Sequence, residues 1–231
     1  MENRFVEGEV LLIDKPLTWT SFNVVKKIEI LLRQTYSLKK IKVGHAGTLD
    51  PLATGLLIVC TGRMTKKITE IQDTEKEYIA TIEFGKTTPS YDLETEYDGE
   101  FPSEHITVEL IKERFKNFIG EIDQIPPLFS AKMVDGKRAY KYARQGIDME
   151  LKPNKIHIYE LELLDFNHPV AIVRVRCGKG TYIRSLAHDL GKAVNSGAHL
   201  KGLKRTISGI YQLKDAISID EFQQNLLTLQ P

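Results

Sequence analysis

Residues 42–57 read Lys-Val-Gly-His-Ala-Gly-Thr-Leu-Asp-Pro-Leu-Ala-Thr-Gly-Leu-Leu, and no other stretch of the chain is as informative. Glycine-rich sequence surrounds a single carboxylate, that of Asp50, and an apolar run follows. Pro51 restricts Asp50 to extended backbone conformations, and the glycines permit close approaches that a side chain would block. The pattern predicts a stiff loop that holds one acid beside the imidazole of His45. A surface Asx turn is the alternative for an Asp-Pro pair in a loop.

The rest of the sequence predicts a protein of both helices and strands. Strands outnumber helices and do not alternate strictly with them, which favours an α+β fold with a mixed or antiparallel sheet over a doubly wound fold. Thr20 or Ser21 is expected to begin the first long helix, and Ser218 begins a capping box. Apolar periodicity predicts strands at 8–14, 56–60, 76–84, 122–133, 156–166 and 170–177, and helices at 22–33, 65–71, 107–119, 182–193 and 221–229.

Composition limits the class of protein. The 231 residues are 42% hydrophobic and 27% charged, which is ordinary for a globular chain with one large domain or two small ones. Cys60 and Cys177 are isolated, with no CxxC pair, and fit a reducing compartment. We find no signal peptide after Met1 and no apolar run near the roughly 18 residues of a membrane span, so we expect a cytoplasmic protein without a membrane partner.

The net charge of +1 hides an uneven distribution along the chain. Residues 69–123 contain 15 Asp and Glu against 5 Lys and Arg, whereas residues 170–214 contain 9 Lys and Arg and one Asp. Such segregation predicts a face that binds a polyanion, because Lys and Arg contacts to phosphates supply much of the affinity for nucleic acids. The alternative is that these segments interleave in space and neutralise one another.

Residues 42–57 closely resemble the catalytic motif of the TruB-type tRNA pseudouridine synthases. The resemblance extends over nearly the whole chain, with the other motifs of the family in order. Two departures are Thr18, where many members have Gly, and Lys204, where an Arg pair is common. The further matching stretches are Leu-Leu-Ile-Asp-Lys-Pro at 11–16, Lys-Glu-Tyr at 76–78, Cys-Gly-Lys-Gly-Thr-Tyr-Ile-Arg at 177–184, the runs at 197–200 and 203–205, and two parts of an insertion at 126–132 and 140–146.

The resemblance implies a pseudouridine synthase fold in a single catalytic domain over residues 1–231. An insertion at about 124–155 is expected to grip RNA, and no C-terminal PUA domain is expected. The implied reaction converts the uridine at position 55 of tRNA, in the TΨC loop, to pseudouridine. The uracil N1–C1′ bond breaks, the base rotates, and C5 joins C1′. No net oxidation or reduction occurs, so we expect neither a cofactor nor a metal.

The same resemblance assigns roles to single residues. Asp50 is the catalytic carboxylate, and attack on the sugar, attack on the base and assistance in proton removal all stay open. Arg184 is its charge partner, because a permanently charged guanidinium would keep a carboxylate ionised in a dry pocket. The target base must be flipped out of the RNA, with His45 filling the vacated space and Tyr78 stacking on the uracil. The other residues expected to bind substrate are Lys15, Pro16, Leu203, Lys179 and Tyr182.

Each of these residues also has an ordinary interpretation. His45 could be a surface polar residue, Tyr78 a core aromatic, and Arg184 a solvated helix charge; the turn at 178–181 could receive a phosphate or merely cap a helix. We expect a monomer that binds the T-arm of tRNA without a guide RNA. One rival is a non-catalytic tRNA binder, which would not need a carboxylate facing an anionic ligand. Another is a guide-dependent relative in a ribonucleoprotein, which would need a PUA-like tail.

Overall fold

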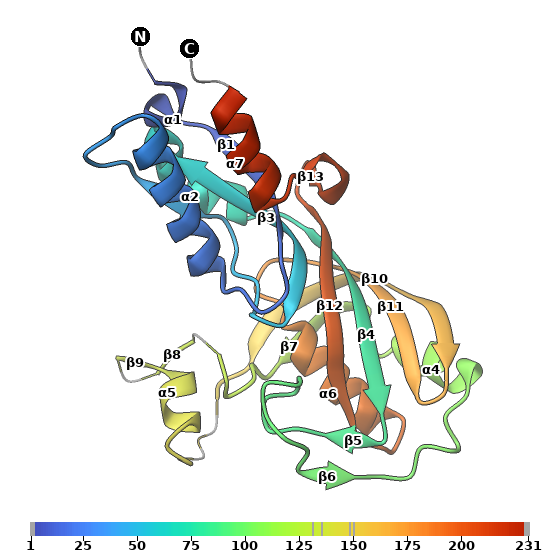
Figure 1. The fold of residues 1–231 in the computed structure, drawn as a ribbon. Helices are drawn as coiled ribbons and strands as arrows, with labels where there is room; N and C mark the ends of the chain where they lie inside the picture. Colours follow the sequence, from blue (N-terminus) through green and yellow to red (C-terminus); the bar gives the residue numbers. More distant parts are fainter. Residues whose placement is uncertain (1–2, 131, 135, 148, 150, 229–231) are drawn as a thin grey trace. The chain divides into compact units, whose positions relative to one another are not determined.

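The structure is a computed structural model that describes residues 3–130, 132–134, 136–147, 149 and 151–228 (Figure 1). Contacts among residues divide the chain into two compact units, Met1–Tyr78 with Lys204–Pro231 (unit 1) and Ile79–Leu203 (unit 2). Both boundaries fall inside strands, one in β4 (Lys76–Phe84) and one in β12 (Ala198–Ser208). A unit defined by contacts need not fold alone, so the expectation of one catalytic domain stays a prediction.

Unit 1 is organised around β3, whose residues Leu56–Cys60 are completely buried. Strand β3 pairs antiparallel with β1 on one side, where Val10 lies opposite Cys60, and also with β2. The elements of unit 1 are α1 (Arg4–Glu7), β1 (Val10–Lys15), α2 (Ser21–Thr35), β2 (Val43–His45), β3 (Ala53–Thr61), η1 (Gly62–Lys67), α3 (Ile68–Gln72), β13 (Tyr211–Gln212), η2 (Leu213–Asp215) and α7 (Ile219–Thr228), with parts of β4 and β12.

Helix α2 covers one side of this sheet because its sequence has an apolar face. Thr20 is the N-cap and forms a capping box with Asn23, which fixes where the helix begins. The apolar side chains of α2 pack with those of β1, β3 and α7 in one buried cluster. The cluster consists of Phe5, Ile13, Val24, Ile28, Leu31, Leu32, Ile41, Leu57, Val59, Ile219, Phe222 and Leu226.

Unit 2 contains the other part of the sheet, in which the strand order is β12-β4-β11-β10-β7. Strand β10 pairs antiparallel with both β11 and β7, and helix α4 contacts β10 and α6. The further elements of unit 2 are β5 (Lys86–Thr87), β6 (Gly99–Glu100), α4 (Val108–Phe115), β7 (Gly120–Gln124), β8 (Met133–Val134), β9 (Lys137–Arg138), α5 (Ala139–Ala143), β10 (Asn154–Asn167), β11 (Val170–Cys177) and α6 (Ile183–Ala193).

The structure has the expected α+β fold, a mixed sheet flanked by helices. The strands predicted at 76–84 and 170–177 have the predicted bounds. The strand predicted at 122–133 is correct at 122–124 and wrong at 125–130. Strand β7 ends at Gln124, because Pro126 and Pro127 have no backbone N–H for a sheet ladder.

Two further differences concern helix α4 and strand β12. Helix α4 ends at Phe115 rather than near Ile119, which is 45% exposed. Gly120 does not end the helix; it begins β7 with a φ of 99°. Strand β12 was not predicted. Polar and charged residues at 201–206 interrupt its apolar alternation, although Ala198–Leu200 are consecutively buried.

Candidate active site

Asp50 lies in the loop between β2 and β3, at residues 46–52, and is half-buried. The loop turns tightly after the acid, since the Ala53 amide donates to the Asp50 carbonyl at 3.1 Å. Its first residue is tied to the sheet by a hydrogen bond from the Ala46 amide to the Ile58 carbonyl, 2.9 Å long. The glycine-rich sequence therefore forms the stiff loop that the pattern predicts.

Side chains and backbone from the start of α2 hold this loop in place. The hydroxyl of Ser21, buried at the first position of α2, accepts a hydrogen bond from the Leu49 amide at 2.9 Å and donates to the Leu49 carbonyl at 3.0 Å. The Thr18 amide donates to the Pro51 carbonyl at 2.9 Å. The residues on either side of Asp50 are thus both anchored to the segment at 18–21.

Lys15 is fully buried at the end of β1, and its ammonium supports the loop from within. It donates to the carbonyls of Pro16 at 2.9 Å, Trp19 at 2.5 Å and Pro51 at 3.3 Å. Burial lowers the pKa of Lys15 to about 8, although the charge of Asp50 opposes this shift. Lys15 is therefore mostly protonated at neutral pH and places a positive charge close to the acid.

Arg205, from β12, is a second buried cation that fixes the loop. Its Nε donates to the Leu56 carbonyl at 2.7 Å, and its Nη2 donates to the Gly47 carbonyl at 3.1 Å. Gly55 allows β3 to approach this residue, since a Cβ at Gly55 would lie 2.4 Å from the Arg205 carbonyl oxygen. Sequence reasoning assigned no role to Ser21 or Arg205 at the site.

His45 is the last residue of β2 and is half-buried beside the loop. Burial and the charge of Arg205 lower its pKa, and a backbone hydrogen bond to Gly47 opposes the shift. The imidazole is therefore neutral at physiological pH.

The remaining predicted residues of unit 1 are Pro16, which is exposed, and Tyr78, which is 9% exposed on β4. Strand β4 is fixed around Tyr78 by polar contacts. The hydroxyl of Thr206 donates to the carboxylate of Glu77 at 2.8 Å, and the buried ammonium of Lys76 donates to backbone carbonyls. Tyr78 thus lies close to the polar contacts that anchor the start of β4.

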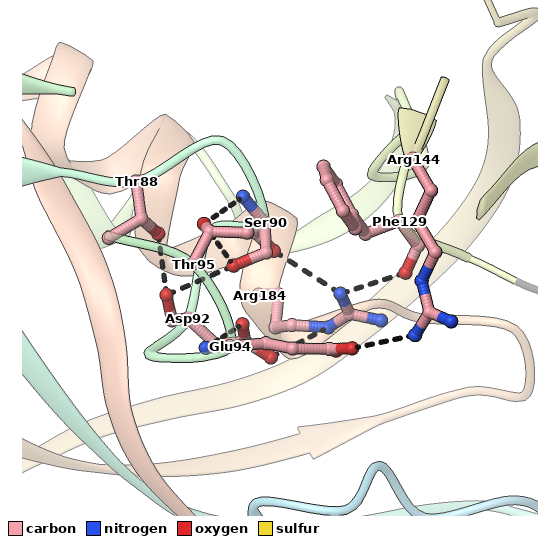
Figure 2. A network of polar contacts seen from close by, with 8 residues as sticks. All are labelled: Thr88, Ser90, Asp92, Glu94, Thr95, Phe129, Arg144 and Arg184. Carbon is pink, nitrogen blue, oxygen red and sulfur yellow. Dashed lines mark hydrogen bonds and ion pairs between the residues drawn. The ribbon is translucent and has the colours of Figure 1, made fainter. Parts of the chain in front are cut away.

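Arg184, the second residue of α6, lies in a buried polar cluster of unit 2 (Figure 2). Its Nη1 donates to the carbonyls of Ser90 at 3.2 Å and Phe129 at 3.0 Å. Its Nε lies 3.7 Å from Oδ2 of Asp92, which is also buried. A guanidinium paired with a carboxylate in this way keeps a fixed orientation, and removing either partner would leave a buried charge.

The loop at 88–95 is ordered around Asp92 by its own hydroxyl groups. Thr88 Oγ1 donates to the Asp92 carbonyl at 2.6 Å, and the Glu94 amide donates to Asp92 Oδ1 at 3.0 Å. Figure 2 shows Arg144 of the insertion reaching the carboxylate of Glu94, at 3.5 Å. The acidic, turn-rich sequence at 89–102 predicts an exposed segment, and this prediction is wrong for Ser90 and Asp92, which are buried in contact with Arg184.

The other predicted residues of unit 2 lie near the start of α6 and on β12. Tyr182 is the N-cap residue, and its amide and carbonyl both bond to the side-chain amide of Gln124, at 2.8 and 3.0 Å. Lys179 is exposed and Leu203 is half-buried. The pairing of Asp50 with Arg184 joins residues of the two units and stays a prediction.

Four acids of unit 2 form ion pairs with cations from distant parts of the sequence. Two of the cations come from the basic segment at 170–214 and two from the insertion at about 124–155, so the alternative of interleaved segments holds for these residues. The ion pairs are Glu83–Lys201 at 2.5 Å, Glu94–Arg144 at 3.5 Å, Glu121–Lys155 at 2.7 Å and Asp92–Arg184 at 3.7 Å.

The described residues contain neither a candidate metal site nor a candidate membrane-spanning helix. No group of three or more His, Cys, Asp or Glu side chains within the described ranges is placed to hold a metal ion. None of the helices in the described part of the chain is both long enough and apolar enough to cross a membrane.

The fold is similar to that of a chain in the crystal structure of a Cbf5-Nop10-Gar1 complex, with a TM-score of 0.71 and 28% identity, covering 95% of this chain and 54% of that one. A chain in the structure of an H/ACA RNP bound to a substrate RNA containing 2'-deoxyuridine gives a TM-score of 0.68 and 26% identity, with the same coverage. This chain thus spans about half the length of those chains. The likeness assigns the fold to the pseudouridine synthase class of enzymes.

Sequence comparison identifies the family within the pseudouridine synthases. Residues 33–183 match the TruB family pseudouridylate synthase (N terminal domain), and residues 184–230 match the tRNA pseudouridylate synthase B C-terminal domain. The tRNA pseudouridine synthase B of Phocaeicola vulgatus is 59% identical over 95% of this chain and 94% of its own length. That of Parabacteroides distasonis is 56% identical over 98% of both. The chain belongs to the TruB family of pseudouridylate synthases.

Proposed function

We propose that the protein isomerises the T-loop uridine at position 55 of tRNA to pseudouridine, with Asp50 as the catalytic carboxylate. The observation that carries the proposal is the anchored loop at 46–52, which presents one half-buried acid and whose backbone carbonyls accept hydrogen bonds from two buried cations, Lys15 and Arg205. The relatives that match over nearly their whole length are named tRNA pseudouridine synthase B. The reaction breaks the N1–C1′ bond of uridine and forms a C5–C1′ bond, with no net oxidation or reduction.

The side chains of the site take separate roles in this reaction. Extruding the base costs a few kcal/mol of stacking and pairing, and His45 offsets part of this by filling the vacated space as a neutral ring. Tyr78 stacks on the extruded uracil. In the catalytic complex Arg184 acts as the charge partner of Asp50 and keeps the carboxylate ionised in a site from which RNA excludes water.

Lys15 and Arg205 contribute by positioning rather than by contact with RNA, since both are fully buried. Their hydrogen bonds fix the carbonyls of Gly47, Pro51 and Leu56, on both sides of Asp50. A catalytic group held in its reactive geometry loses little entropy when the substrate binds. Pro16, Lys179, Tyr182 and Leu203 complete the proposed substrate-binding set.

Exposed cations support RNA binding by both units. In unit 1 the segment before β2 and the 3-10 helix η1 are joined by a hydrogen bond from the Gly62 amide to the Lys42 carbonyl, 2.8 Å long. In unit 2 the insertion presents Arg144 over the ring of Tyr140, at 5.5 Å. Cations and aromatic rings of this kind suit phosphates and unstacked bases. The exposed cations of the two joined segments are Lys39, Lys40, Lys42, Arg63, Lys66 and Lys67.

We further propose that the enzyme binds the T-arm of tRNA as a monomer, without a guide RNA. The relatives that match over their full length are named as tRNA enzymes. The chains of the Cbf5-Nop10-Gar1 and H/ACA RNP structures are about twice as long. A cytoplasmic location follows from the proposed substrate, because bacterial tRNA is cytoplasmic.

The test is single-nucleotide mapping of pseudouridine in an unmodified tRNA transcript incubated with purified protein and no additive. The wild type is compared with Asp50→Asn, and with Asp165→Asn as a control on an exposed aspartate of β10. We expect product at position 55 from wild type and Asp165→Asn, and none from Asp50→Asn, whose folding and tRNA affinity stay nearly unchanged. Turnover by Asp50→Asn would overturn its assignment. Tight binding by the wild type without product would favour the non-catalytic tRNA binder.

A further inference from the structure

The imidazole of His188 stacks on the ring of Tyr91, with centroids 3.8 Å apart and planes 11° from parallel. His188 lies on α6 one turn after Arg184, and Tyr91 stands between Ser90 and Asp92. Three consecutive residues of the loop therefore contact the same helix: Ser90 through its carbonyl, Tyr91 through its ring, and Asp92 through its carboxylate.

Tyr91 has a backbone conformation that needs support. Its φ of 63° lies in the left-handed region, which is unfavourable for a residue with a Cβ. Its amide donates to the Thr88 carbonyl at 3.1 Å, and its carbonyl accepts from the Leu200 amide at 2.9 Å. This conformation directs the groups on both sides of Tyr91, Ser90 and Asp92, toward Arg184. Residues in such conformations persist when the surrounding structure fixes them, and they concentrate at functional sites.

His188 uses the face of its ring rather than its polar atoms. Nδ1 is buried and has no hydrogen-bond partner among the described residues. Burial, with a smaller contribution from Lys192, lowers the pKa of His188 to about 4, although Asp98 opposes the shift. The imidazole is therefore neutral at neutral pH. A neutral ring with an unused nitrogen is a stacking surface.

We propose that His188 is a positioning residue of the active site: by stacking on Tyr91 it holds the loop at 88–95 so that Ser90 and Asp92 orient Arg184. This inference rests on the proposed function for its kinetic readout. Arg184 acts in the chemical step, so loss of the stack lowers the rate constant with saturating enzyme and leaves tRNA affinity unchanged. Neither the hydrogen-bonding capacity of the imidazole nor its charge is required.

The test uses three substitutions and two readouts. His188→Phe keeps a neutral flat ring, His188→Ala removes it, and Tyr91→Ala removes its partner; the double variant His188→Ala/Tyr91→Ala completes a mutant cycle. The first readout is single-turnover pseudouridine formation with tRNA affinity measured separately. The second is amide hydrogen exchange of residues 88–92, which does not depend on activity.

We expect His188→Ala to slow the chemical step by about threefold to tenfold, the range set by the stabilisation of an aromatic pair. Its tRNA affinity stays unchanged and exchange at 88–92 becomes faster. His188→Phe restores both readouts, and the double variant is no slower than the slower single variant. If His188→Phe is as slow as His188→Ala, or if the two alanine effects multiply, the inference is overturned. Should the wild type make no pseudouridine, the proposed function fails, and unchanged exchange in His188→Ala would then refute the inference by itself.

Discussion

Replacing Ser21 with alanine tests whether the start of α2 holds the loop at 46–52, which contains the proposed catalytic residue Asp50. The Ser21 hydroxyl is buried and is bonded to both the amide and the carbonyl of Leu49, the residue before Asp50. Alanine keeps the Cβ and creates almost no cavity, so the loss is confined to these two hydrogen bonds. The substitution therefore isolates the anchoring of the loop from the packing of the helix.

The expected loss of stability follows from the two backbone groups left without a partner. A buried polar group deprived of its hydrogen bond costs about 1–3 kcal/mol. With some relaxation of the loop, Ser21→Ala is expected to lower the free energy of unfolding by about 2–4 kcal/mol. The chemical step should slow as well, because displaced Leu49 moves the neighbouring carboxylate and misplaced catalytic groups lose rate steeply.

The assay combines urea unfolding with single-turnover pseudouridine formation, and Thr20→Ala is the matched control. Thr20 is the exposed N-cap of the same helix, so its loss costs about 1 kcal/mol of stability. It has no side-chain bond to the loop among the described contacts, and the chemical step should be unaffected. If Ser21→Ala is no less stable than Thr20→Ala, or forms product at the wild-type rate, the proposed anchoring is refuted.

Three other substitutions give measurable consequences in unit 1. Thr18 has a φ of 69°, so Thr18→Gly should raise the free energy of unfolding in urea by about 0.5–1 kcal/mol, and a loss would contradict the assignment of strain. The pKa of Lys15 is about 8 when folded against 10.5 when unfolded, so the unfolded chain binds more protons between these values, and stability due to Lys15 rises with pH there. The free energy of unfolding is therefore measured for wild type and Lys15→Met at about pH 7 and pH 10. Relative to Lys15→Met, the wild type should be more stable at pH 10 than at pH 7, and an equal difference at both pH values would refute the lowered pKa. Arg205→Met should lower the unfolding free energy by about 3 kcal/mol, because the buried carbonyls of Gly47 and Leu56 lose a charged donor, and a loss below about 1 kcal/mol would show that these bonds are dispensable.

The sequence correctly predicted the helices and strands that are determined by neighbouring residues. The alternation at 76–84 and the capping box at Ser218 are properties of neighbouring residues, and β4 and α7 form as expected; the Ser218 amide bonds to Glu221 at 2.7 Å. Strand β12 was not predicted because its pairing with other strands, rather than its own apolar pattern, stabilises it. The predicted strand over 122–133 also contains Ala131, which lies outside the described residues.

In the candidate site, too, features with a local cause could be predicted from the sequence, and features that depend on distant residues could not. The stiffness of the loop around Asp50 could be predicted, because proline restricts the backbone of its neighbour and glycine permits close approaches of the backbone at its own position. The groups that satisfy the buried carbonyls of the loop could not, since Ser21 and Arg205 come from distant parts of the sequence. The role of Asp92 was not predicted for a similar reason. An acid in a polar segment is expected to be solvated, and its buried partner, Arg184, is distant in the sequence.

The hydrogen bonds of Arg205 also affect how the protein is made. They join residues separated by 149 and 158 positions, so Gly47 of the loop at 46–52 and Leu56 of the strand that follows it are both bound to a residue much later in the sequence. Synthesis runs from the N-terminus, and earlier segments begin to fold while later ones are still inside the ribosome. The loop can therefore reach its final geometry only after residue 205 has emerged. A ribosome-bound nascent chain thus carries Asp50 long before that carboxylate is held as it is in the finished protein.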